Sequence, residues 1–173
     1  MFRKMLFVSA LAILPATVAS AQVRVPMQGD WEIRLGGGGS NNQDFNAGSF
    51  NIDGSLGYYL SKQLEVSLRQ SVSYGDNNNG TAWNGSTRVA LDLNFDLGKF
   101  QPYVGANIGF VYGDSVSDTW AAAPEAGVRF YVLDRTFIFG QAEYQFFFRD
   151  SGGIGDGFDN GQFVYSLGIG FNL

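Results

Sequence analysis

A two-residue alternation of apolar and polar side chains runs through most of this 173-residue chain. It is plainest in the last stretch, GQFVYSLGIGFNL, where every second residue up to Leu173 is apolar. A period of two is the pattern of a β-strand with one apolar face. Such a strand has an edge that invites aggregation, so another strand must cover it.

Seven earlier segments show the same alternation. Their first apolar residues are Trp31, Phe50, Leu64, Val89, Val104, Trp120 and Ile138. Three connections are tight (SKQ, GKFQ and LDRT), whereas most of the others are longer and rich in Gly, Asn and Asp, as in GGGGSNNQDFNAGS and GDNNNGTAWNGS. The stretch GGGGS at residues 36–40 is expected to form a flexible rim. Because eight is an even number, the last strand can pair with the first. The sequence therefore predicts an all-β fold, an eight-stranded antiparallel up-and-down β-barrel.

The first 21 residues are expected to be a cleaved signal peptide, and residues 22–173 the barrel. Arg3 and Lys4 precede the short apolar run MLFVSALAIL, and Ala19-Ser20-Ala21 then forms a small-x-small cleavage site. The alternative is a retained N-terminal anchor. Beyond this segment no apolar run is long enough for a membrane-spanning helix.

The composition excludes several classes of function. The chain has no cysteine and no histidine, which removes disulfides, thiolate chemistry, histidine-dependent catalysis and the usual zinc sites. After the leader, lysine occurs only at Lys62 and Lys99, both in turns. With 11 basic and 16 acidic residues the chain is acidic, which argues against a nucleic-acid partner. We expect neither an enzyme nor a cofactor.

The distribution of charge decides which face points outward. The apolar face carries no charged residue, whereas the opposite face holds acids, arginines and small residues. An eight-stranded barrel has room inside only for its own side chains, so the small and charged set belongs there. Aromatic residues also gather near both strand ends, as they do at the two interfaces of a bilayer. These features predict a transmembrane barrel. They disfavour a soluble carrier with an apolar interior.

The charged residues of the polar face are predicted to form a network of ion pairs inside the barrel. They are Glu32, Arg34, Asp53, Glu65, Arg69, Arg88, Asp92, Asp96, Glu125, Arg129, Glu143 and Arg149. Which arginine meets which acid is left open. A closed plug is expected, with a narrow pore for ions or small solutes as the alternative.

The long loops are acidic and offer only a weak metal site. The candidates are Asp150, Asp156 and Asp159, whose carboxylates are suited to share divalent cations with lipopolysaccharide phosphates. The stretch GDGFDNG lacks a calcium-loop pattern. The alternative is that these residues form solvated turns.

Three stretches, FQPYVGANIGFVYGD, PEAGVRFYV and VYSLGIGFNL, resemble the small eight-stranded bacterial outer-membrane barrels. This family includes the transmembrane domain of outer-membrane protein A and the opacity and porin-like surface proteins. The resemblance implies a monomer in the bacterial outer membrane of a Gram-negative cell, in contact with lipid and lipopolysaccharide and with both termini in the periplasm. It implies a role in envelope structure or surface interaction.

The resemblance also implies partners during biogenesis, namely the barrel-insertion machinery and periplasmic chaperones. In this family the alternating residues of the last strand act as the insertion signal. Here they are Phe163, Tyr165, Leu167, Ile169, Phe171 and Leu173. The terminal position is Leu173, where phenylalanine is usual.

Overall fold

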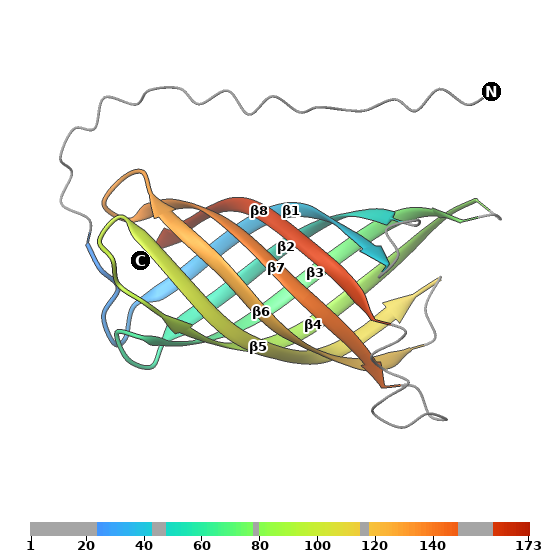
Figure 1. Cartoon of the computed structure of the whole chain (residues 1–173), viewed down its shortest axis with the longest axis horizontal. Coiled ribbons are helices and arrows are strands. Elements are labelled where there is room, and N and C mark those ends of the chain that lie inside the picture. Colours follow the sequence, from blue (N-terminus) through green and yellow to red (C-terminus); the bar gives the residue numbers. More distant parts are fainter. Residues whose placement is uncertain (1–23, 43–47, 78–79, 115–117, 149–160) are drawn as a thin grey trace.

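The barrel predicted from the alternation is present in the structure, a computed structural model that describes residues 24–42, 48–77, 80–114, 118–148 and 161–173. Its strands in chain order are β1 (Trp31–Asn42), β2 (Gly48–Tyr59), β3 (Leu64–Asn77), β4 (Gly80–Asn94), β5 (Phe100–Gly113), β6 (Thr119–Tyr131), β7 (Thr136–Phe148) and β8 (Gln162–Asn172). Each strand pairs antiparallel with the next, and β8 pairs with β1 (Figure 1). The predicted all-β, eight-stranded, up-and-down transmembrane barrel is confirmed. Within the described residues, no helix has the length and apolar character needed to cross a membrane.

The end of the chain is where the barrel closes. The β1–β8 ladder runs from Glu32 opposite Asn172 to Asn42 opposite Gln162. The amide of Leu173 then donates a hydrogen bond of 2.8 Å to the carbonyl of Trp31. The final strand therefore has partners on both sides, and its apolar pattern creates no free edge.

The two faces of the sheet are divided as the charge distribution predicts. The large apolar residues of the strands point outward, and Leu167 is 70% exposed. Glu32 and Arg129 point inward and are completely buried. Phe137 and Phe139, which share the polar phase of β7, also lie inside. An apolar exterior around a charged interior is the arrangement that a lipid environment favours.

Two predicted loops are largely strand. Gly36–Gly39 continue β1, with ladder partners on β2 and on β8, so the expected flexible rim at this position is wrong. The stretch from 75 to 86 was expected as a loop, but β3 continues to Asn77 and β4 begins at Gly80. Neighbouring strands supply hydrogen-bond partners that local propensity does not reveal. Pairing with neighbouring strands thus extends the strands into Gly- and Asn-rich sequence.

The tight turns and both chain ends of the barrel lie together at one end (Figure 1). Residues 24–30 cross this end between the β6–β7 turn and the start of β1. The amide of Arg24 donates to the carbonyl of Asp134 at 3.2 Å, and the amide of Gly29 donates to the carbonyl of Tyr59 at 2.9 Å. Pro26, between them, is fully buried. This segment helps to cover the tight-turn mouth.

Candidate functional site: the barrel lumen

Ten of the predicted interior charges face the lumen, and among the described residues Asp96 does not. Because β4 ends at Asn94, Asp96 falls in the following turn, where it is exposed. Its Oδ1 accepts a hydrogen bond of 3.0 Å from the amide of Gly98. The prediction that Asp96 joins the network is therefore wrong, because the strand, and with it the alternation of faces, ends two residues before Asp96. Arg149 lies outside the described residues.

The first cluster of charges is built around Arg129 of β6, near the tight-turn end. Its guanidinium pairs with the carboxylate of Glu65 and, at 3.2 Å, with that of Glu32. It also donates to the side-chain oxygen of Asn94. Arg34 of β1 contacts Glu32 through its Nε at 2.9 Å. Two arginines thus share the carboxylates of Glu32 on β1 and Glu65 on β3 in a buried site.

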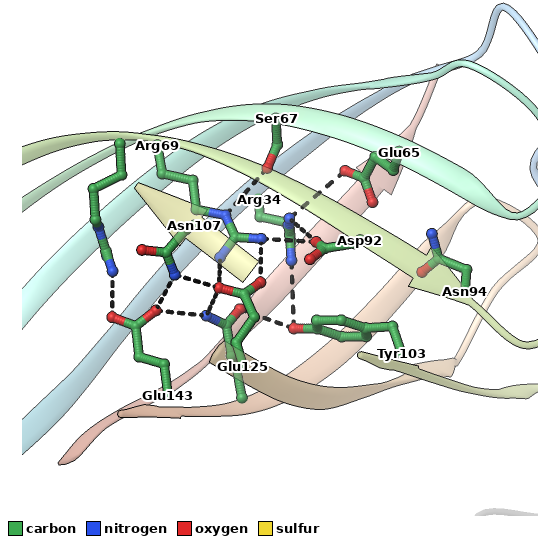
Figure 2. A network of polar contacts seen from close by, with 12 residues as sticks. Arg34, Glu65, Ser67, Arg69, Asp92, Asn94, Tyr103, Asn107, Glu125 and Glu143 are labelled. Atoms are coloured by element: carbon green, nitrogen blue, oxygen red, sulfur yellow. Dashed lines mark hydrogen bonds and ion pairs between the residues drawn. The ribbon is translucent and has the colours of Figure 1, made fainter. Parts of the chain in front are cut away.

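The second cluster is centred on Arg69 of β3 (Figure 2). Its Nη2 lies 2.7 Å from both Asp92 Oδ2 and Glu125 Oε1, and its Nη1 donates to Glu125 Oε2 at 2.7 Å. The Nε–H donates to Ser67 Oγ at 3.1 Å. Arg34 Nη2 is 3.5 Å from Asp92 Oδ2, which joins the first two clusters.

The third cluster holds Glu143 of β7, which pairs with Arg88 of β4. Amide groups satisfy the rest of this carboxylate: Asn107 donates at 2.9 Å and Gln145 at 2.7 Å. Asn107 also donates to Glu125 Oε2 at 2.5 Å, so the second and third clusters are continuous. The three clusters form one network across the barrel.

Asp53 of β2 faces the lumen but stands apart from this network. Its Oδ1 accepts from Ser166 Oγ at 3.1 Å and from Asn51 Nδ2 at 3.3 Å. Among the described residues it forms no ion pair within 4.0 Å. A cavity of about 10 Å³ lies beside it, bounded by Arg34 and Arg88 among others. That is about the least space that holds a single water molecule.

Aromatic side chains fill much of the remaining space in the half of the lumen near the tight turns. They are Tyr59, Tyr103, Tyr131, Phe137 and Phe139, all buried. None of the five was among the predicted site residues. The sequence carried a signal for them, because each occupies an inward position in its strand.

These rings also contact the charges directly. The guanidinium carbon of Arg129 lies 4.4 Å from the ring centre of Tyr103, and that of Arg34 lies 5.7 Å from the ring centre of Phe139. Tyr59 donates to Glu32 Oε2 at 2.9 Å. The cations therefore gain cation–π contacts that help to offset their burial.

The other half of the lumen, toward the loop end, is lined in the described residues by uncharged and mostly small side chains. Hydroxyl groups pair across neighbouring strands: Ser40 with Ser49 at 2.6 Å, and Ser71 with Ser86 at 2.7 Å. Other inward positions at this level hold alanine and valine, as at Ala82, Val111, Ala121 and Val164, or uncharged polar side chains such as Gln145 and Gln162. Several of these serines are only half-buried. The two halves of the lumen thus differ in both charge and filling.

A search of the described residues finds no group of three or more Asp and Glu side chains placed to hold a metal ion. The weak loop candidates Asp150, Asp156 and Asp159 lie outside those residues. Asp114 and Asp118, at the ends of another long loop, are exposed. The geometry of the lumen is that of ion pairing.

The residues of the predicted insertion signal all lie on the outward side of β8. Tyr165, Leu167, Ile169, Phe171 and Leu173 are exposed, and Phe163 is half-buried. Phe163 packs edge-on against Tyr144 of β7, with ring centres 4.7 Å apart. The pattern is therefore displayed on the lipid-facing surface, and its role as a signal stays a prediction.

Solved structures share this architecture. The N-terminal β-barrel domain of Pseudomonas aeruginosa OprF superposes with a TM-score of 0.61, covering 86% of this chain and 100% of that chain at 19% identity. Neisserial surface protein A gives a TM-score of 0.66 at 14% identity, with 84% and 98% covered. The fold is that of the small eight-stranded outer-membrane barrels.

A third such barrel, the attachment invasion locus protein Ail of Yersinia pestis, gives a TM-score of 0.53 at 16% identity, covering 85% of this chain and 100% of that chain. No family model matches the sequence. No curated protein matches it either. At these identities the likeness is one of fold, so the function has to be argued from the residues of this chain.

Proposed function

We propose that this protein is an integral outer-membrane barrel with a structural or surface-interaction role in the bacterial envelope, and that its lumen is closed to solutes. The observation that carries the proposal is the continuous ion-pair network across the half of the lumen near the tight turns. The side chains of Glu32 and Arg129 have no exposure to water at all. The proposal includes no catalytic activity.

The energetics of the network support closure. An ion or solute crossing this layer would have to separate buried pairs such as Arg69 with Asp92 and Glu125. Leaving one buried charge without its partner costs about 3–5 kcal/mol. The buried rings of Phe137 and Tyr103 fill space beside the pairs, as expected for the narrow interior of eight strands. Closure is therefore the low-energy state.

A narrow pore is the second candidate function. It is favoured by the half of the lumen near the loops, where half-buried serines and other uncharged side chains line the interior. In this candidate, only the charged layer separates the two mouths, and conduction follows a rearrangement of its ion pairs.

The partners and placement follow from the outer surface. A belt of exposed apolar side chains, with aromatic residues at both ends, fits the lipid of an outer membrane and its lipopolysaccharide. We propose a monomer with both termini in the periplasm, delivered by a cleaved signal peptide of residues 1–21. We also propose that periplasmic chaperones and the barrel-insertion machinery read the outward residues of β8 during biogenesis.

The surface role we propose differs from polyanion binding. One structure of Ail holds a heparin analogue, sucrose octasulfate. In this chain the exposed loop residues Asp114 and Asp118 are acidic, and the chain as a whole has a net charge of −5. Like charges would repel a sulfated sugar, and the same repulsion argues against nucleic acid. A neutral or cationic surface partner suits these loops better.

Single-channel recording tests the proposal directly. Protein extracted from membranes and checked by heat-modifiable gel mobility is inserted into a planar bilayer. A closed lumen predicts a silent bilayer although insertion is demonstrated independently. Discrete and reproducible conductance steps would contradict closure and favour the narrow pore.

A further inference from the structure

One polar cluster lies on the lipid-facing surface of the barrel, outside the lumen. Gln70 occupies an outward position of β3, between the apolar Leu68 and Val72. Its ladder partner on β4 is Thr87, which also points outward, and both side chains are exposed. Tyr112, the last outward residue of β5, completes the cluster. A glutamine in this row is unexpected, because an amide is costly in a hydrocarbon environment.

The three side chains are joined by hydrogen bonds. Thr87 Oγ1 donates to Gln70 Oε1 at 2.6 Å. Gln70 Nε2 donates to the hydroxyl oxygen of Tyr112 at 2.8 Å and to the carbonyl of Ser71 at 3.3 Å. The polar atoms of Gln70 therefore all have partners.

Two glycines shape the surface around the cluster. The ring of Tyr112 crosses Gly85 on β4, where an added β-carbon would lie 2.9 Å from the ring Cζ, so only glycine leaves the ring its path toward Gln70. On the other side, the ladder partner of Gln70 on β2 is Gly54. A β-carbon at Gly54 would meet only Leu35 Cδ2 at 3.7 Å. The surface is thus indented next to Gln70.

The cluster keeps one hydrogen-bond donor that is nearly unused. The hydroxyl of Tyr112 accepts from Gln70, and its own proton has Thr87 Oγ1 as its acceptor only at 3.5 Å, the limit of a hydrogen bond. Because Thr87 donates its own proton to Gln70, its oxygen can act toward Tyr112 only as an acceptor. An acceptor supplied from outside the protein would give the Tyr112 proton a shorter bond.

The depth of the cluster indicates which kind of outside acceptor could reach the Tyr112 hydroxyl. It lies at the inner edge of the aromatic residues near the loop end: the rings of Trp83 and Tyr112 are 6.3 Å apart, and Thr87 pairs with Phe110, whose ring is 5.7 Å from Trp120. Such aromatic belts sit at the level of the lipid headgroups. Directly beneath the headgroups lie the ester carbonyls that carry the acyl chains.

We propose that Gln70, Thr87 and Tyr112 form a lipid site, in which the Tyr112 hydroxyl donates to an acyl-ester carbonyl of an outer-leaflet lipid and the chain lies along the indentation at Gly54. A lipid fits better than a second copy of the barrel, because one free donor in an apolar surface matches one acceptor atom. The inference rests on the proposed membrane location. Its test reads lipid preference and not conductance, so the two proposals can fail separately.

The test compares two bilayers that differ in this carbonyl. Protein extracted from membranes is reconstituted into vesicles of ester-linked diacyl phosphatidylcholine, or of ether-linked dialkyl phosphatidylcholine with the same chain length. Urea unfolding gives the folding equilibrium constant of the natural protein, of Tyr112→Phe and of a matched control, Tyr74→Phe on the neighbouring part of the same aromatic belt. Effects of bilayer thickness and hydration apply equally to all three.

The site predicts that Tyr112→Phe lowers the folding constant more in the ester bilayer than in the ether bilayer, by about three- to tenfold, the net worth of one hydrogen bond. Tyr74→Phe is expected to show no such difference. Gln70→Leu, which removes the group that holds Tyr112 in place, is expected to abolish the lipid preference as well. An equal effect of Tyr112→Phe in both bilayers would overturn the proposal, as would an effect that appears only when cross-linking detects a pair of barrels.

Discussion

The two halves of the lumen are built from the same eight strands but are filled by different kinds of side chain. Near the tight turns, arginines, carboxylates and aromatic rings fill the space, and Glu32, Glu65 and Arg129 have no exposure. Near the loops, serines such as Ser71 and Ser73 are half-buried and bond to neighbouring hydroxyl or carbonyl groups. The sheet is continuous through both halves, so the difference comes from the inward side chains alone.

The half filled by charges closes the barrel, and the stability of the barrel depends most on its ion pairs staying intact. Burying paired charges is costly, and a buried pair adds little net stability compared with apolar packing. Breaking such a pair is nevertheless severe, because the remaining charge has no water to solvate it. The charged half should therefore tolerate substitution poorly, whereas the hydroxyl-lined half should tolerate it well.

The largest effect is expected for Arg129→Ala. The change removes a cation that Glu32 and Glu65 share, and the expected loss in unfolding free energy is about 3–5 kcal/mol. Urea unfolding of the reconstituted protein measures it. A double variant, Arg129→Leu with Glu65→Leu, should recover part of the loss because it removes the stranded carboxylate as well. A loss below about 1 kcal/mol, the range of exposed ion pairs, would contradict a buried plug.

A smaller effect is expected for Glu143→Gln, at the boundary between the halves. The amide is nearly the same size as the carboxylate and retains bonding capacity toward Asn107, but it leaves Arg88 without its anionic partner. Losing one charged hydrogen bond predicts a destabilisation of about 1.5–3 kcal/mol, measured in the same unfolding experiment. If Glu143→Gln is as severe as Arg129→Ala, the charged half of the lumen extends beyond Glu143 toward the loop end.

The smallest effect is expected for Ser71→Ala in the half near the loops. Its hydroxyl bonds to that of Ser86 at 2.7 Å, and water can take over the bond because Ser71 is half-buried. The expected cost is about 0.5–1 kcal/mol. Ser67→Ala, at a buried inward position of the same strand beside Arg69, serves as the matched variant. Ser67→Ala should cost more than Ser71→Ala, and the reverse order would contradict the comparison.

The sequence predicted the barrel and its faces because a period of two fixes the direction of every side chain once one face is known. That rule placed Arg34, Arg69 and Arg129 in the lumen. It failed at Asp96, where the strand had already ended, because the alternation of side chains does not show where the backbone hydrogen bonds between strands stop. The expectation of a flexible rim at Gly36–Gly39, which came from the glycine content, was also wrong, because partners on β2 and β8 override a weak strand propensity.

The pairing of the charges could not be predicted from the sequence. Arg69 reaches Asp92 on the adjacent strand but also Glu125 across the lumen, a contact that depends on the tilt of the strands and the radius of the barrel. Asp53 shares its phase with these residues, yet it bonds to Ser166 and Asn51. The lipid-facing cluster at Gln70 was likewise hidden, since its partner Tyr112 lies two strands away.

Thiol labelling tests the difference between the two halves most directly, because the natural chain has no cysteine to react. Ser73→Cys and Ser67→Cys place a thiol at two inward positions of β3, one in each half. A small water-soluble maleimide is added to the reconstituted protein, and the modified fraction is followed by mass spectrometry over time. A closed charged layer predicts rapid labelling at position 73 and none at position 67 while the barrel is folded. Equal labelling at both positions would show that water passes the charged layer, and would contradict a closed lumen.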